Sequence, residues 1–553
     1  MPRLVAWLRS GTPALVAVLL LLVAAPLLAL LHEALRPLLS GGGWSATLHG
    51  WLGADAMPAL RDTLTLAALA ALFAMLLGAG AGLLTHLAPP RGLAMVEPML
   101  LVSFLIPPYL TAEAWSVLAG PAGLWQRALG FGGMRLATWL YSLPGMALVM
   151  ALHLVPLVYV MVAGALRGVD ERLADCARVH GAGPAHAAWI AYRPTLVPAL
   201  LSSALLVFLA SCEEFGVPKA LGDYAGVRVL SVAVEESMSV WPVDLPRAAG
   251  IGLLLALLAL ALWMLTRRMY GDARVAAHCR VRRRRAWSAW PLLLLALVAG
   301  GLPLAGILVA ALQKAITNGL RADNWTWAHF AEVLHPGGAG LQALTVSVEV
   351  SVAVSVVGTA LALFAAWVLE TARGRAARRL ELLAYLPQAI PGVVLGTGLV
   401  LFWNAPWNPL PVYGHVAILA TAYLTLTFPY AMRYAVNGLA QAPAGLTRAA
   451  AVHGAGPLRI LGRIRLPLAW PFLLGGGTVV FALSMRELAA SSLLQPPGTQ
   501  VVSTYVFEQF DQGNAGEGMA MAVVGVLSTA LLLGVARALL SRRQDAKTVA
   551  GLE

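Results

Sequence analysis

Long apolar runs alternate with short polar segments along the whole chain. Residues 13–31 contain no charged side chain, and neither do residues 251–266 or 291–312. A bilayer core about 30 Å thick is crossed by roughly 20 helical residues at 1.5 Å per residue. The pattern therefore predicts helices that cross a membrane. The first run is longer than the apolar part of a secretory signal peptide, so we interpret it as a span as well.

Twelve such runs can be placed, six in each half of the chain. They fall at 12–31, 60–86, 95–119, 138–166, 196–216, 245–266, 289–312, 342–369, 380–403, 413–438, 468–490 and 519–540. The expected fold is an all-α polytopic membrane protein with about 12 transmembrane helices. We expect one six-helix domain over 1–270, a basic linker over 271–288 and a second six-helix domain over 289–553.

Composition and charge placement support this organisation. The chain is 59% hydrophobic and 12% charged, with a net charge of +12, whereas soluble domains carry about 25% charged residues. If the segments alternate between the two sides, one side carries 26 Lys and Arg and the other carries 7. The basic side is expected to be cytoplasmic. Both termini then lie in the cytoplasm, and the positive charge does not indicate a nucleic-acid partner.

The pentapeptide His-Gly-Ala-Gly-Pro occurs twice, at 180–184 and at 453–457. The copies lie 273 residues apart, in the cytoplasmic loops 167–195 and 439–467 between the fourth and fifth spans of each half. A proline follows the first glycine by thirteen residues in both copies, at Pro194 and Pro467. The chain is therefore an internal duplication. Six spans per half give both halves the same orientation, which is a parallel repeat with a pseudo-twofold axis along the membrane normal.

Each pentapeptide predicts a sharp bend between two helices. Gly181 and Gly454 can take the left-handed conformation that ends a helix. Pro184 and Pro457 suit the first turn of the next helix, where no N–H is needed. We therefore expect a short rigid elbow in each cytoplasmic loop.

The second copy resembles the EAA loop of binding-protein-dependent ABC importer permeases. That pattern is Glu-Ala-Ala, three residues, Gly, nine residues, then Ile-x-Leu-Pro. The second copy matches it at Ala449, Ala450, Gly454 and Ile464 to Pro467 but has Arg448 in place of Glu. The first copy keeps Asp175, Ala177, Gly181 and Pro194, while residues 191–193 replace Ile-x-Leu.

The resemblance implies two tandem ABC importer permease domains in a bacterial inner membrane. Each elbow would dock on a cytoplasmic ABC ATPase dimer, while a periplasmic binding protein would deliver the substrate. The expected coupling residues are Asp175, Ala177, Gly181, Ala182, Gly183, Pro184, Arg448, Ala449, Ala450, Gly454, Ala455, Gly456, Pro457, Ile464, Leu466 and Pro467.

We expect the energy for transport to come from the partner ATPase. The chain has three lysines, none of which follows a glycine, so it has no Gly-Lys-Ser/Thr phosphate loop. We predict no catalytic residue and no bound cofactor, with ATP and Mg²⁺ used by the separate ATPase. The three cysteines show neither metal-ligand spacing nor a disulfide framework, and we predict no metal site.

The sequence says less about the identity of the substrate than about the class of protein. The fused two-half form resembles ferric-iron permeases, which favours ferric iron, and thiamine, a phosphonate or a polyamine are the alternatives within the same importer class. Charged side chains inside a membrane are costly and are often functional. Five are candidates for the translocation path: Glu213, Glu214, Glu349, Arg486 and Glu487.

Two other classes of protein fit the sequence less well. A 12-helix secondary transporter would need buried ion-coupling residues and has no use for two equal elbows. A membrane enzyme would need a nucleophile or metal motif, and the sequence shows none of the motifs considered.

Overall fold

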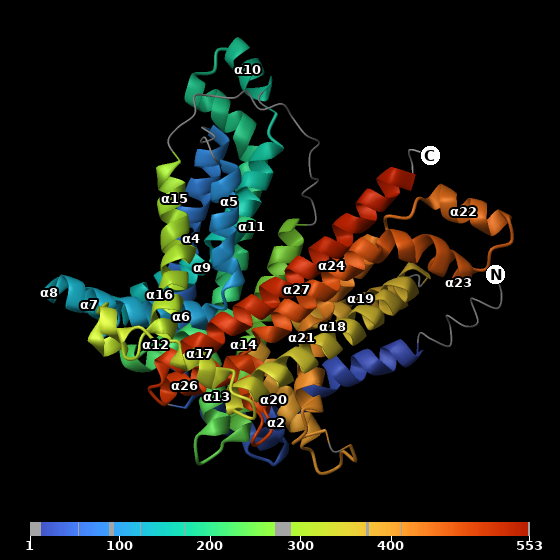
Figure 1. Cartoon of the computed structure of the whole chain (residues 1–553). Coiled ribbons are helices and arrows are strands. Elements are labelled where there is room, and N and C mark those ends of the chain that lie inside the picture. The colour runs from blue at the N-terminus through green and yellow to red at the C-terminus, as the bar shows by residue number, and fades with distance from the viewer. Residues whose placement is uncertain are drawn as a thin grey trace. The chain divides into compact units, whose positions relative to one another are not determined.

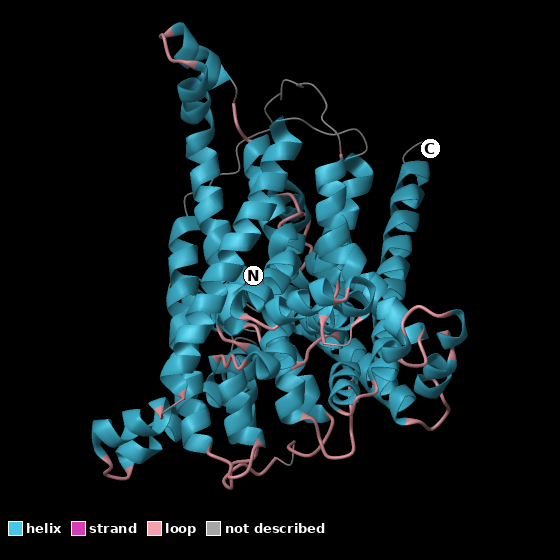
Figure 2. Cartoon of the chain, turned by 90° about the vertical axis from the view of Figure 1, so that its left-hand side faces the viewer, coloured by secondary structure: helices cyan, strands magenta, loops and turns pink. Residues whose placement is uncertain are grey.

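The computed structural model describes residues 13–53, 55–87, 93–121, 123–170, 172–270, 289–371, 375–410 and 412–550. The predicted basic linker at 271–288 and the first twelve residues lie outside the described residues. The described residues form helices, and no strand occurs among them beyond one isolated bridge between Gln313 and Trp325. Figure 2 shows this helical architecture.

Nine described helices are long and apolar enough to cross a membrane, and two further helix pairs satisfy the test as bent spans. The nine are Pro13–Leu39, Ala56–His86, Leu143–Arg167, Pro184–Glu213, Leu245–Thr266, Trp290–Leu312, Ala339–Glu370, Pro457–Met485 and Ala515–Ala536. A further 23-residue helix, α21 (Ala417–Leu439), occupies the place of the tenth predicted span. The expected all-α polytopic fold is confirmed.

The chain forms two compact units. The elbow-1 unit comprises Trp51–Glu236 and Leu254–Trp327. Its elements are α4 (Ala56–Leu87), α5 (Leu93–Leu105), α6 (Pro108–Ala119), α7 (Leu124–Leu129), α8 (Phe131–Leu140), α9 (Leu143–Arg167), α10 (Arg172–Val179), α11 (Pro184–Glu213), α12 (Gly216–Ala225), α15 (Trp290–Ala296), the π-helical η2 (Leu297–Gly301), α16 (Leu302–Leu312), and the short η3 (Ile316–Asn318) and η4 (Ala322–Asn324).

The elbow-2 unit comprises Met1–Gly50, Ser237–Leu253 and Ala328–Glu553. Its elements are η1 (Leu20–Ala24), α2 (Ala25–Leu39), α17 (Ala328–Val333), α18 (Ala339–Thr371), α19 (Arg375–Tyr385), η5 (Leu386–Ala389), α20 (Gly392–Trp403), α21, α22 (Ala444–Val452), α23 (Pro457–Ile460), η6 (Leu461–Arg465), α24 (Leu466–Met485), α25 (Ala489–Leu494), α26 (Val502–Asp511) and α27 (Ala515–Ala550). The helices α3 (Gly43–Leu52), α13 (Leu230–Ser239) and α14 (Leu245–Tyr270) run from one unit into the other. Figure 1 labels most of these helices.

The compact units do not coincide with the two sequence halves, because the halves exchange their first spans. The first span, η1 and α2, packs on α19, α20 and α21 of the second half. The first span of the second half, α15 to α16, packs on α5, α6 and α9 of the first half. Small residues allow this close approach, as is usual between membrane helices. A Cβ on Gly398 would lie 2.7 Å from the Pro26 carbonyl oxygen, and one on Gly306 would lie 3.1 Å from that of Ala114.

The third span of each half is broken, which corrects the continuous helices expected at 95–119 and 380–403. The helix axis turns by 101° between α5 and α6 and by 111° ahead of α20. The breaks fall at Ile106-Pro107-Pro108 and at Ile390-Pro391. Pro107 and Pro391 both have extended backbone, with ψ of 141°. Proline lacks an N–H and its ring crowds the carbonyl four residues earlier, so a helix cannot continue undistorted through it.

Three described π-helical turns lie just ahead of prolines. The turns η1, η2 and η6 each end two residues before a proline, at Pro26, Pro303 and Pro467. A wider turn leaves room for the carbonyl that the proline ring would otherwise crowd. The first two turns occupy matching places in the first spans of the two halves, so the duplication extends beyond the pentapeptides.

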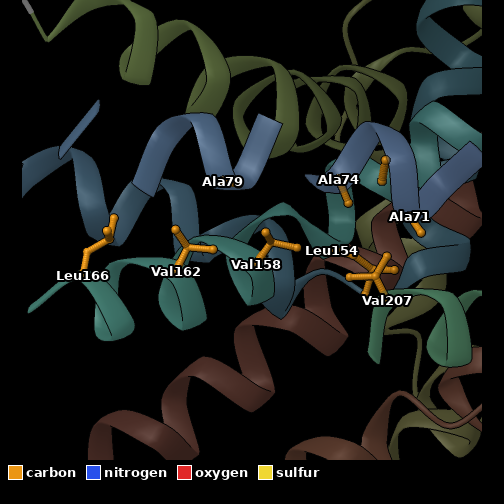
Figure 3. Packing of buried hydrophobic residues seen from close by; sticks show 9 residues of the cluster. Ala71, Ala74, Ala79, Leu154, Val158, Val162, Leu166 and Val207 are labelled. Atoms are coloured by element: carbon orange, nitrogen blue, oxygen red, sulfur yellow. The ribbon is translucent and has the colours of Figure 1, made fainter. Parts of the chain in front are cut away.

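Small residues pack the second span against its neighbours. In the elbow-1 unit, Ala71, Ala74 and Ala79 of α4 lie against Val158 and other residues of α9 and α11, as Figure 3 shows. A Cβ on the adjacent Gly78 would lie 2.7 Å from Val158 Cβ. In the elbow-2 unit, α18 packs on α21 and α24 in the same way. In both units, the second span of the half is therefore packed against the fourth and fifth spans of that half.

Candidate functional site

Both elbows have the backbone geometry that the sequence predicts. We define elbow 1 as residues 172–184 and elbow 2 as residues 444–457. Gly181 and Gly454 are left-handed, with φ of +86° and +78°. Pro184 and Pro457 are the first residues of α11 and α23. In Figure 1, α10 and α22 mark the two elbows.

The same two hydrogen bonds close the end of the helix in both elbows. In elbow 1, His180 Nδ1 donates to the Cys176 carbonyl at 2.8 Å, and the Ala182 N–H donates to the Ala177 carbonyl at 3.0 Å. The matching bonds in elbow 2 join His453 to Ala449 (2.9 Å) and Ala455 to Ala450 (3.0 Å). These bonds satisfy carbonyls that a helix end leaves without an intrahelical partner. Both histidines thus stabilise the bend of their elbow.

Each elbow exposes an apolar pair that the sequence analysis missed. Val179 and Val452 are 85% and 84% exposed, and Leu173 and Leu446 are 48% and 49% exposed. The valines and the leucines occupy matching positions in the two copies. These exposed apolar side chains give each elbow a surface that another protein could cover. The signal available in the sequence was an aliphatic residue directly before each pentapeptide.

The elbows differ in charge. In elbow 1, Asp175 Oδ1 pairs with Arg178 at 3.4 Å, and both side chains are well exposed. In elbow 2, Arg448 takes the place of Asp175, and Ala451 takes the place of Arg178. A partner with identical docking surfaces would therefore meet similar shapes that carry different charges.

The elbows also differ in the helix that follows. In elbow 1, α11 continues without interruption from Pro184 to Glu213. In elbow 2, the four-residue α23 leads into the π turn η6, which contains Ile464, and then into α24, which begins at Leu466 and Pro467. The Ile-x-Leu-Pro sequence thus lies where the helix changes its pitch.

A side-chain pair ties each of these helices to the second span of its own half. In the elbow-1 unit, His86 Nε2 of α4 hydrogen-bonds with the Tyr192 hydroxyl at 3.2 Å, and the two rings meet edge to face. In the elbow-2 unit, Arg465 of η6 forms an ion pair with Glu370 of α18. Tyr192 and Arg465 hold the same position in the repeat. We call these contacts the elbow-end pairs.

Two of the five candidate path residues serve as helix caps. Glu214 Oε1 accepts the N–H groups of Gly216 and Val217 at 3.0 and 3.4 Å, at the start of α12. Glu487 Oε1 accepts the Ala490 N–H at 2.9 Å, at the start of α25. A carboxylate in this position satisfies orphan N–H groups and interacts favourably with the helix dipole.

The other three candidates have different surroundings. Glu213 ends α11, and its Oε1 is buried without a hydrogen-bond partner in the described part of the chain. Glu349 is exposed on α18, inside a span. Arg486 follows α24 as its C-cap. Glu213 and Glu214 belong to the elbow-1 unit and the other three to the elbow-2 unit. Among the described residues, no group of three or more His, Cys, Asp or Glu could hold a metal ion.

Polar contacts also hold the segments that follow the caps. In the elbow-1 unit, Lys219 Nζ and Glu235 Oε2 pair at 2.8 Å and join α12 to α13. Burial opposes the charge of Lys219, but the hydrogen bond and charge of Glu235 outweigh it, so the pKa of Lys219 is raised. In the elbow-2 unit, Glu508 accepts hydrogen bonds from Gln495 and Gln500.

The elbow-2 unit contains a cavity of about 990 Å³. His32, Glu33 and Arg36 of α2 line one side, and residues 400–402 and 404–407 with Tyr413 line another. The ring of Phe402 meets that of Trp407 edge to face at 5.6 Å. The cavity lies near the start of α21 and elbow 2 follows its end, so about 35 Å of helix separates them. The cavity and elbow 2 therefore lie near opposite ends of α21.

Repeated helical halves, paired elbows and broken third spans define a membrane transport subunit. The chain matches the family described as "Binding-protein-dependent transport system inner membrane component" twice, over residues 74–271 and 358–546. It belongs to that family and is a permease of a binding-protein-dependent ABC importer, with two permease domains in one chain.

The chain is similar to permeases named for a phosphonate and to permeases named for ferric iron. The chain is 32% identical over 232 residues to the putative 2-aminoethylphosphonate transport system permease protein PhnV of Salmonella typhimurium, over 42% of this chain and 86% of that protein. It is 23% identical over 445 residues to the ferric transport system permease protein FbpB of Actinobacillus pleuropneumoniae, over 78% of this chain and 64% of that protein. A putative ferric permease FbpB 1 of Haemophilus influenzae is 24% identical over 415 residues, 73% of this chain and 65% of that protein.

Proposed function

We propose that the chain forms the translocation path of an ATP-driven importer and is driven through its two elbows by a cytoplasmic ABC ATPase dimer. One observation carries this proposal: two elbows with the same backbone bonds each expose the same Leu and Val pair. Two elbows of the same shape suit a partner made of two identical subunits. The chain itself would bind no cofactor, and ATP and Mg²⁺ would act on the ATPase.

Closure of the ATPase dimer on ATP would change the separation of the two docking grooves and so displace each elbow. The helices α11 and α23 begin at the elbows and would move with them. A ligand shifts a conformational equilibrium only through its different affinity for the two states. ATP would favour the state in which the docking grooves are closed, and the elbows would transmit this preference to the spans.

For the cargo, we propose ferric iron. The relatives named as ferric permeases align across both halves, so they share the fused architecture. Glu213 and Glu349 remain as path candidates with carboxylates that are not used as caps, and carboxylate oxygen is a preferred ligand of hard cations. A second candidate is 2-aminoethylphosphonate, because the relatives of that name share the higher identity, 32%.

We place the docking site of the periplasmic binding protein at the mouth of the cavity in the elbow-2 unit. Trp407, Leu410 and Tyr413 are 68%, 52% and 42% exposed on the segment between α20 and α21. Arg36, with its side chain 65% exposed, lies on the cavity wall. Trp, Tyr and Arg are the residues that most often dominate binding energy at protein interfaces.

The test is import into cells that express the chain with its ATPase and its periplasmic receptor. Uptake of radiolabelled ferric iron and of 2-aminoethylphosphonate is measured for the native chain and for Gly454→Val. The proposed cargo predicts saturable iron uptake that is lost in the variant. Uptake of the phosphonate alone would overturn iron as the cargo, and uptake of either compound without the ATPase would overturn the proposed energy source.

A further inference from the structure

The second span of each half is hydrogen-bonded at its far end as well as at its elbow end. Thr63 Oγ1 of α4 accepts the N–H of Leu230, the first residue of α13, at 2.9 Å. Ser347 Oγ of α18 accepts the N–H of Val502, the first residue of α26, at 2.7 Å. Both hydroxyl side chains are 2% exposed. We call these contacts the far-end bonds.

The distance between the two attachments is the same in both halves. His86 lies 23 positions after Thr63 on α4, and Glu370 lies 23 positions after Ser347 on α18. At 1.5 Å per residue the attachments are about 35 Å apart, which is slightly more than the bilayer core. The two spans have few residues in common between these points, so the repeated spacing reflects the architecture rather than close sequence identity.

The helix between the attachments is well suited to transmit movement. It is continuous in both halves, over Ala56–Leu87 and Ala339–Thr371. In the elbow-1 unit, alanines and Gly78 hold it tightly against α9 and α11. In the elbow-2 unit, Ser355 Oγ of α18 donates to the Gly477 carbonyl of α24 at 2.7 Å. A closely packed interior moves as a body and does not deform gradually.

We infer that α4 and α18 act as struts that carry the movement of each elbow to the short helices α13 and α26 on the far side of the membrane. The inference rests on the proposed docking of the ATPase at the elbows. Tyr192 and Arg465 lie on the helices that begin at the elbows, eight positions after Pro184 and Pro457. His86, Tyr192, Glu370 and Arg465 are therefore positioning residues, as are Thr63 and Ser347 at the far end.

The two struts are attached to their elbows with different chemistry. The ion pair in the elbow-2 unit joins two charges whose side chains are 24% and 36% exposed. The pair in the elbow-1 unit includes a hydrogen bond between His86 and Tyr192 and an edge-to-face contact of their rings. Hydrogen bonds between ionised groups are roughly twice as strong as neutral ones. The strut of the elbow-2 unit therefore follows its elbow more closely.

The experiment uses the full chain reconstituted in liposomes with its ATPase and receptor. Transported substrate per ATP hydrolysed is measured for Arg465→Glu, for Glu370→Arg and for the double exchange. Each single variant is expected to keep its ATPase and to transport about fivefold less per ATP, the lower end of usual coupling between sites. The double exchange restores the ion pair with reversed polarity and is expected to return the ratio to within about twofold.

Three further variants separate positioning from folding. Arg463→Glu makes the same charge change on an exposed residue of the same turn and is expected to leave the ratio unchanged. Ser347→Ala removes the far-end acceptor and is expected to lower transport per ATP without releasing the ATPase. In the elbow-1 unit, Tyr192→Phe removes one oxygen atom and is the mildest test, with a smaller loss than Arg465→Glu.

The strut is overturned if Arg465→Glu and Ser347→Ala both keep the native ratio, or if the double exchange stays as low as the single variants while the protein remains folded. The proposed docking has a separate readout. If Gly454→Val retains the ATPase in full, the elbow is not the docking site, whatever the elbow-end variants show. The two failures are thus distinguishable.

Discussion

Elbow 1 and elbow 2 agree closely in their own backbone and differ in how they are attached to the rest of their units. Both contain a left-handed glycine and the same two closing hydrogen bonds, and both expose the same apolar pair. Behind them, one is followed by an unbroken helix and a His-Tyr contact, the other by a π turn and an ion pair. Surfaces that meet a symmetric partner must match in shape, whereas the contacts inside each half are free to diverge.

The largest expected effect comes from the elbow glycines. Gly454→Val forces a β-branched residue to φ near +78°, a conformation that costs L residues roughly 1–2 kcal/mol. We expect ATPase association to fall about tenfold or more, since each 1.4 kcal/mol is tenfold in affinity. Co-purification and titration of the ATPase measure the loss, with Gly445→Ala in the same elbow as the control.

Gly181→Val makes the same test in elbow 1. Equal losses would show that the two elbows contribute equally despite their different charges. A variant that binds the ATPase as tightly as the Gly445→Ala control would contradict docking at that elbow.

The exchanged first spans offer a comparison of stability between the two units. Gly398→Ala would place a Cβ 2.7 Å from a backbone oxygen, whereas Gly306→Ala would place one at 3.1 Å. Overpacking of this kind costs about 1–3 kcal/mol, and we expect Gly398→Ala to be the more damaging. Thermal unfolding in lipid nanodiscs measures the effect, with Gly164→Ala as the control because its Cβ meets open space. Equal stability of Gly398→Ala and this control would be inconsistent with the exchanged packing.

Substitution of the two capping glutamates tests whether their carboxylates are structural or line the translocation path. Glu487→Ala and Glu214→Ala are each expected to lower stability by about 1 kcal/mol, the usual cost of losing a helix cap. Because a cap does not touch the cargo, the apparent KM for the receptor-delivered substrate should stay constant. Uptake kinetics and unfolding temperature are measured together. A raised KM with unchanged stability would return these residues to the path.

The smallest effect is expected when elbow 1 is given the ion pair that attaches elbow 2. His86→Glu together with Tyr192→Arg gives elbow 1 the ion pair of elbow 2. A partly exposed ion pair is worth less than about 1 kcal/mol, so hydrogen exchange of residues 172–183 should slow by roughly two- to threefold. Mass spectrometry follows the exchange, and each single substitution serves as the control. Slowing in a single variant as large as in the double variant would exclude the ion pair as its cause.

Sequence patterns predicted what depends on local chemistry. The all-helical fold, the elbows, the left-handed glycines and the prolines at the helix starts all follow from short-range rules, and the structure has them. The role of the elbow residues in ATPase docking stays a prediction, and so does the role in the path of Glu213, Glu214, Glu349, Arg486 and Glu487. The breaks in the third spans were missed, although Pro107 and Pro391 signalled them, because an apolar run reads as one span whether it is straight or bent.

Long-range packing could not be predicted in the same way. Nothing near Pro26 in the sequence indicates that its carbonyl will lie against Gly398, and nothing near Glu370 indicates Arg465. Glu214 and Glu487 were expected on the path because charges inside membranes are often functional. Their role as caps depends on the chain turning directly after them, which the apolar pattern does not reveal.

The exchange of first spans has a consequence for how the chain is made. The first span leaves the ribosome before α20, on which it packs, has been synthesised, so it must wait in the lipid while several hundred residues follow. The first half likewise waits for the span that begins near Trp290 before its own packing is complete. Each half therefore completes its packing only with a span of the other, and a single continuous polypeptide supplies both halves together and in equal amount.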